Sequence, residues 1–146
     1  MPGALMVTAV MPAAAVPRGS RVPVVLSRVP AGVPSPADGS LAGFTDLAAL
    51  LDAGPSCYWV RAEGESMTGA GILSGDLLLV DTSVEVRSGD VVVAAVDGDL
   101  TVKRYVRRGA RVSLLAANPA FAPIELGEGQ ELVVWGVVTA VVRQTR

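Results

Sequence analysis

Residues 91–106 read Val-Val-Val-Ala-Ala-Val-Asp-Gly-Asp-Leu-Thr-Val-Lys-Arg-Tyr-Val, and this stretch decides the fold class. Two runs rich in valine flank Asp97-Gly98, a dipeptide that tolerates the left-handed backbone of a tight hairpin turn. In the second run successive side chains alternate between two faces, and Lys103 shares its face with Thr101 and Tyr105. The stretch therefore predicts an antiparallel hairpin that gives Lys103 a fixed direction on a rigid strand.

Similar runs of β-branched and apolar residues continue on both sides of the hairpin. The expected strands are Tyr58–Glu63, Leu77–Val80, Val91–Val96, Leu100–Val106, Val112–Ala116 and Leu132–Val142. Before them we expect one short helix with leucines at helical spacing, Thr45 as its N-cap and Gly54-Pro55 as its stop. The predicted fold class is mainly β with one short helix.

The first part of the chain has a different composition. Seven of the ten prolines fall within residues 1–36, a density that excludes a stable helix-turn-helix there. We expect residues 1–43 to form an extended, mobile arm and residues 44–146 to form one β-rich domain.

Composition narrows the partners and the compartment. A net charge of −2 provides no basic field for nucleic acid, so direct DNA binding is not expected. Cys57 is the single cysteine, which excludes an intrachain disulfide and a cysteine zinc cluster and fits a reducing compartment. The apolar start lacks a basic n-region, and no apolar run reaches the roughly 18 residues of a membrane span. We expect a cytoplasmic protein without a metal or other cofactor.

The chain offers few groups for catalysis. It contains no histidine, and Lys103 is its single lysine. Gly64-Glu65-Ser66-Met67 follows an expected strand directly, and a serine becomes a nucleophile only when a base removes its proton. A lysine in an apolar site can serve because desolvation lowers its pKa, whereas arginine does not deprotonate in proteins.

Residue types alone leave other interpretations open. A turn serine and a solvated strand lysine are the commonest use of such residues. If Ser66 does act as a nucleophile, the rival bases to Lys103 are carboxylates, namely Glu63, Glu65 and Asp81.

Four segments occur in a specific order along the chain: Cys57–Met67, Gly75–Asp81, Ser88–Gly98 and Thr101–Arg104. In this order they resemble the peptidase domain of the LexA-type self-cleaving serine peptidases, over roughly residues 31 to 143. Within that family the resemblance is closest to UmuD, an accessory subunit of an error-prone DNA polymerase. The resemblance implies a LexA/signal-peptidase-like fold.

The resemblance also implies roles for individual residues. Ser66 corresponds to the nucleophile and Lys103 to its general base, while backbone amides near Glu65 and Ser66 are the expected oxyanion donors. The family cuts its own N-terminal arm after a small residue that precedes glycine, which Ala31-Gly32 matches. The following residues Val33–Ala37 are similar to those after the UmuD cleavage site.

Prolines around this bond bias the arm toward extended geometry, which a cleft beside strands binds with little further ordering. A plain proline-rich linker is the alternative interpretation.

By resemblance, the expected partners are a second copy in a homodimer, an error-prone polymerase subunit, and a RecA-DNA filament that triggers cleavage in the SOS response to DNA damage.

Three rival functions differ in what they require of the chain. LexA-type repressors carry a helical DNA-binding domain, for which the proline-rich start leaves no room, and residues 1–28 do not resemble the family's arm. Membrane signal peptidases share Ser/Lys chemistry but need an anchoring helix. The non-enzymatic alternative is an interaction module of the same fold that binds a polymerase or another partner.

Overall fold

The structure is a computed structural model that describes residues 3–13, 21–25, 41–126 and 132–146. The expected cleavage site, Ala31 and Gly32, lies outside the described residues.

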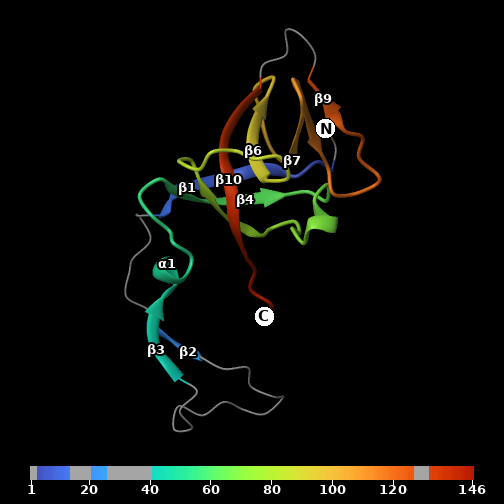
Figure 1. Cartoon of the computed structure of the whole chain (residues 1–146). Coiled ribbons are helices and arrows are strands. Elements are labelled where there is room, and N and C mark those ends of the chain that lie inside the picture. The colour runs from blue at the N-terminus through green and yellow to red at the C-terminus, as the bar shows by residue number, and fades with distance from the viewer. Residues whose placement is uncertain (1–2, 14–20, 26–40, 127–131) are drawn as a thin grey trace.

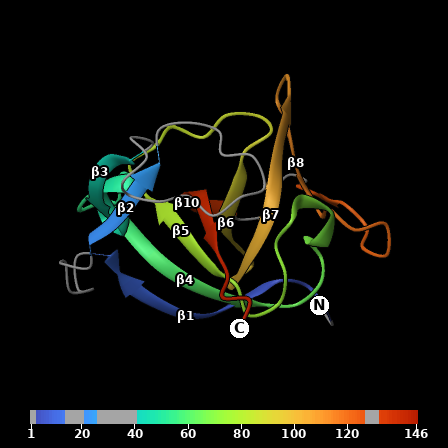
Figure 2. The same cartoon turned by 90° about the horizontal axis from the view of Figure 1, so that it is seen from below.

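Most of the described chain forms one antiparallel sheet (Figure 1). Its eight described strands lie in the order β1-β4-β5-β10-β6-β7-β8-β9. Their bounds are β1 (Met6–Pro12), β4 (Cys57–Glu63), β5 (Leu77–Asp81), β6 (Val91–Val96), β7 (Asp99–Arg108), β8 (Arg111–Leu115), β9 (Ile124–Glu125) and β10 (Leu132–Val142). An additional pairing of β1 with β7 joins Met6 to Thr101 and closes six of the strands into a ring, visible from below in Figure 2.

The predicted mainly β fold is confirmed, and each expected strand is present within two residues of its expected bounds. The β6–β7 hairpin has Val96 paired with Asp99, which leaves Asp97-Gly98 as a two-residue turn. Both turn residues have positive φ, at 50° and 88°, as this type of turn requires.

The short helix begins one residue later than expected. α1 spans Leu47–Leu50, and its N-cap is Asp46, whose carboxylate accepts a 2.7 Å hydrogen bond from the Ala49 amide. The expected cap, Thr45, lies one residue earlier inside β3 (Leu41–Asp46), the strand that ends at the true cap and pairs with β2 (Arg21–Val25) in a separate two-stranded sheet. Within the described residues, no helix has the length and hydropathy that crossing a membrane requires.

The start of the chain differs from the expected mobile arm. Residues 3–13 are built into the main sheet, because β1 runs antiparallel to β4 from the Met6–Glu63 pair to the Pro12–Tyr58 pair. The apolar residues of this segment suit a strand, and an unpaired edge of β4 offers partners to its backbone. The segment's first buried residues, Ala4 and Leu5, are at most 3% exposed.

The main core lies inside the ring of strands. It includes Leu5 from the start of the chain, Val60 and Ala62 of β4, Met67 and Ile72 from the loop after β4, Leu78 and Val80 of β5, Val93 of β6 and Val102 of β7. The β1 segment and the loop that carries Ser66 therefore share one apolar cluster.

Candidate active site

Ser66 lies in the loop that follows β4, between Gly64 and a 3-10 turn at Thr68–Ala70. Its side chain is fully buried, at 0% exposure. Gly64 has a φ of 132°, and a Cβ there would lie 2.2 Å from the carbonyl oxygen of Ala4. Only glycine fits this turn against the β1 segment.

A second loop holds the Ser66 loop in place. The backbone carbonyl of Ser66 accepts a 2.8 Å hydrogen bond from the Ala117 amide. The Asn118 side-chain amide donates to the carbonyl of Glu65 at 2.9 Å, and Gly69 N donates to Ala117 O at 2.6 Å. The loop at 117–118 therefore fixes the backbone on both sides of Ser66.

Lys103 is buried on β7, where it pairs with Val92 of β6 and is 1% exposed. Burial disfavours its charged form and lowers the pKa of the Lys103 ammonium below the ordinary value of 10.5. Its Nζ lies 5.6 Å from the centroid of the Phe121 ring, within cation–π range. The residue thus has the desolvated setting that a lysine base requires.

Leu5 lies between Ser66 and β7. Its amide donates a 2.8 Å hydrogen bond to Ser66 Oγ. Its carbonyl accepts two 3.0 Å hydrogen bonds, from the Val102 amide and from Thr101 Oγ1. Lys103 directly follows Val102, so one backbone residue, Leu5, connects the loop of the expected nucleophile to the strand of the expected base. Among the hydrogen bonds of the described residues, none joins the Ser66 hydroxyl to Lys103.

The backbone amide of Glu65 also contacts the start of the chain. It donates a 2.8 Å hydrogen bond to the carbonyl oxygen of Gly3. A Cβ on Gly3 would lie 3.0 Å from Cζ of Phe121, the ring that also faces Lys103. The amide is therefore placed to bind a peptide carbonyl, while its role as an oxyanion donor stays a prediction.

The rival carboxylate bases, Asp81, Glu63 and Glu65, are less buried than Lys103. Asp81 pairs with Cys57 at the start of β4, whereas Ser66 follows the opposite end of that strand. Hydrogen bonds from the hydroxyl and backbone amide of Ser83 hold the pKa of the Asp81 carboxyl below its usual value. Glu63 and Glu65 are exposed. Lys103 is the buried candidate among the four.

Sequence reasoning missed several residues at this site. From the sequence, Asn118 had no expected role at this site, and Thr101 was expected only to mark a strand face. An apolar, β-branched run at Leu5–Met11 was a usable signal for β1. No local pattern places Phe121 beside Lys103.

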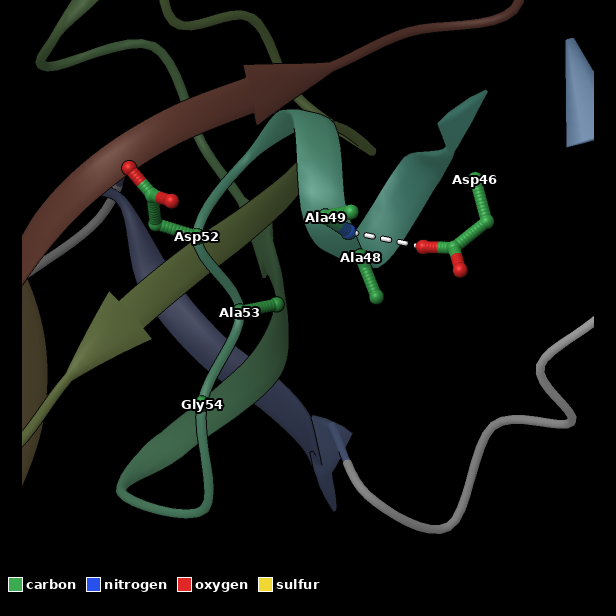
Figure 3. A pocket seen from close by; sticks show the side chains of 6 residues that line it. All are labelled: Asp46, Ala48, Ala49, Asp52, Ala53 and Gly54. Atoms are coloured by element: carbon green, nitrogen blue, oxygen red, sulfur yellow. Dashed lines mark hydrogen bonds between the residues drawn. The ribbon is translucent and has the colours of Figure 1, made fainter. Parts of the chain in front are cut away.

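Two pockets among the described residues lie away from Ser66. One, of about 270 Å³, is formed beside α1 by Asp46, Ala48, Ala49, Asp52, Ala53 and Gly54 (Figure 3). The other, of about 260 Å³, is formed at β8 and β9 by Val106, Arg108, Arg111, Ser113, Leu115, Pro123 and Glu125. Neither contains Ser66 or Lys103.

Comparison with known proteins identifies the family. Residues 23–139 match the Peptidase S24-like family. The chain is 42% identical over 129 residues to LexA repressor 1 of Pseudomonas syringae pv. tomato, covering 88% of this chain and 63% of that protein. It is 40% identical over 121 residues to LexA repressor 1 of Pseudomonas putida, covering 82% of this chain and 60% of that protein.

The chain thus spans about three fifths of the length of these relatives. Their names support the LexA type of peptidase but not the narrower resemblance to UmuD. The family match covers most of the chain and includes both Ser66 and Lys103. The chain belongs to the Peptidase S24-like family.

Proposed function

We propose that this chain is a self-cleaving serine peptidase that cuts its own Ala31–Gly32 bond, with Ser66 as nucleophile and Lys103 as general base. The observation that carries the proposal is the burial of both side chains, at 0% and 1% exposure, next to one backbone residue: Leu5 donates to Ser66 Oγ and accepts from Val102, the neighbour of Lys103. In a chain with no histidine and one lysine, a buried serine and a buried lysine are the candidates for a serine–amine pair.

The first step forms an acyl-enzyme. Ser66 Oγ attacks the carbonyl carbon of Ala31 and passes its proton to the neutral amine of Lys103. Negative charge develops on the Ala31 oxygen, and backbone amides of Glu65 and Ser66 stabilise it. The intermediate then breaks the Ala31–Gly32 bond, and the Gly32 nitrogen leaves as an amine after receiving the proton from Lys103.

The second step is hydrolysis of the ester. Lys103 accepts a proton from water, the hydroxide attacks the Ala31 carbonyl on Ser66, and the proton returns to Ser66 Oγ. The products are a fragment that ends at Ala31 and a fragment that begins at Gly32, with one water consumed. Tethering gives the bond a high effective concentration at Ser66.

The test is incubation of the purified full chain at about pH 7 to 10, followed by mass spectrometry. The expected product spans Gly32 to Arg146, and it is absent when Ser66 is changed to alanine. Cleavage at a different bond would contradict the Ala31–Gly32 assignment. Absence of cleavage even with an activated RecA filament would contradict self-cleavage altogether.

We further infer that the Gly32–Arg146 product acts as an accessory subunit of an error-prone DNA polymerase, as a cytoplasmic homodimer in the SOS response. The similarity of Val33–Ala37 to the segment after the UmuD cleavage site supports this role, and a RecA-DNA filament is its expected trigger. Sedimentation of the product alone and with a purified error-prone polymerase tests both partners. A monomer that does not associate with the polymerase would contradict the role.

The alternative is a non-catalytic interaction module of the same fold. The hydrogen bond from Leu5 N to Ser66 Oγ favours it, because this contact occupies the hydroxyl that would attack. Partner binding that Ser66→Ala leaves unchanged, in a chain that never cuts itself, would support this module.

A further inference from the structure

The space between the Ser66 loop and the start of β7 (Thr101 and Val102), called the groove below, is filled by the start of the chain. Gly3, Ala4 and Leu5 run between the Ser66 loop and β7, and β1 continues from them along β4. Figure 2 shows the beginning of β1 beneath the end of β4, close to β7. With Leu5 in place, Ser66 and Lys103 have almost no exposed surface. A second peptide segment cannot reach them until this one leaves.

The segment occupies the groups that the proposed reaction needs. Ser66 Oγ accepts from an amide of the segment, so an oxygen lone pair faces N–H rather than a carbonyl carbon. The Glu65 amide, an expected oxyanion donor, already donates its hydrogen bond to the Gly3 oxygen.

The other carbonyls of the segment are not held for attack. The Leu5 oxygen is bound on the opposite side by Thr101 and Val102, and the Ala4 oxygen lies against Gly64. The segment is therefore bound in the groove like a substrate but is not placed to be cut.

We propose that residues 3–12 are an internal blocking strand that competes with the Ala31–Gly32 segment for the groove and so sets the rate of self-cleavage. The strand is held by pairing with β4, by the contacts of Leu5 with Thr101 and Val102, and by burial of the Leu5 side chain in the main core. Cleavage requires the minor population in which this strand is released. The inference rests on the proposed function.

A reversible cross-link tests the competition directly. Ala9 of β1 and Arg61 of β4 are exposed, directly paired residues, and paired positions of antiparallel strands have the Cα separation that a disulfide spans. The full chain carries Ala9→Cys and Arg61→Cys in a Cys57→Ala background, with each single cysteine variant as a control. Each reaction is stopped and the sample is then reduced before mass spectrometry, so that the disulfide cannot keep two cleaved products joined. We expect the Gly32 fragment to be absent after incubation in the oxidised form and present after incubation in the reduced form. Equal cleavage by the oxidised and reduced chains would overturn the proposal.

Release of the strand should have the opposite effect. Leu5→Asp puts a carboxylate where a leucine is fully buried, and Met11→Asp makes the same charge change at a 46% exposed position of the same strand. We expect Leu5→Asp to cleave roughly 10- to 100-fold faster than wild type, because losing the burial of one leucine shifts the equilibrium toward the released strand by about that factor. Met11→Asp should cleave at the wild-type rate. Circular dichroism is the control that checks whether both variants are folded.

Hydrogen exchange separates failure of this proposal from failure of the proposed function. The amides of Glu65 and Val102 should be protected in the intact wild-type chain and lose protection in Leu5→Asp. If exchange shows release of the strand while cleavage is no faster, the strand does not block. If no variant ever cleaves, the peptidase proposal fails, and unprotected Glu65 and Val102 amides in wild type would also overturn the placement of the strand.

Discussion

Replacing Lys103 separates the lysine base from its rivals. Lys103→Arg keeps the positive charge and much of the length, but a guanidinium does not release its proton in a protein. Lys103→Met keeps the apolar contacts without any amine. Since general base catalysis contributes about 10²- to 10⁴-fold, both variants should cleave at least about 100-fold more slowly than wild type.

The pH dependence follows from the burial of Lys103. Because burial lowers the pKa of the Lys103 ammonium, the neutral amine is available below the usual range for lysine. Below that lowered pKa, the wild-type cleavage rate should rise about tenfold per pH unit, since only the neutral amine accepts a proton, and it should level off above it. Both variants should lack this rise.

Stability has a matching dependence on pH. The unfolded chain binds the proton of Lys103 at a higher pH than the folded chain does, so wild-type stability falls as pH drops from 10.5 toward the lowered pKa. Lys103→Met escapes this penalty. We expect its advantage over wild type in urea unfolding to be largest below the lowered pKa of Lys103 and to disappear above pH 10.5.

The assay measures the Gly32–Arg146 fragment by mass spectrometry over a pH series, for wild type, Ser66→Ala and the two Lys103 variants. Circular dichroism shows whether each variant is folded. A folded Lys103→Arg chain that makes this fragment at a rate comparable to wild type would refute the Ser/Lys mechanism. A rate that peaks at acidic pH would identify a carboxylate base.

Three further predictions concern the substrate, the loop and the fold. Gly32→Glu should block cleavage by steric exclusion with an unchanged thermal midpoint, and cutting at the wild-type rate would argue against a close-fitting groove. Asn118→Ala removes the hydrogen bond to Glu65 O and should slow cleavage about 2- to 10-fold; an unchanged rate would show that this contact does not position Ser66. Asp76 is 2% exposed and accepts from Arg143 at 2.6 Å, a hydrogen bond that is the main cause of its lowered pKa. Asp76→Asn should therefore cost roughly 1–3 kcal/mol of unfolding free energy at neutral pH, and this loss should shrink as acid protonates the wild-type carboxyl below its usual pKa of 3.8; a loss that is the same in acid would contradict the ion pair.

The sequence by itself determined the features that depend on neighbouring residues. Alternation and turn chemistry identified the β6–β7 hairpin, because a strand repeats every two residues and Asp97-Gly98 tolerates positive φ. Composition singled out Lys103 as the one side-chain amine. The helix cap was wrong by one residue because Thr45 and Asp46 are both good caps, and only the structure shows that β3 continues to Asp46, whose side chain accepts from the Ala49 amide.

Only the tertiary structure decided what fills the groove beside Ser66. The Leu5 amide and Ser66 Oγ are 61 residues apart in the chain, and Leu5 O and Thr101 Oγ1 are 96 apart. A proline-rich start predicted an arm, whereas Leu5 is buried in a core assembled from β4, β5, β6 and β7. Such contacts leave no periodic signal in either segment, because they depend on which strand edges meet once the sheet closes.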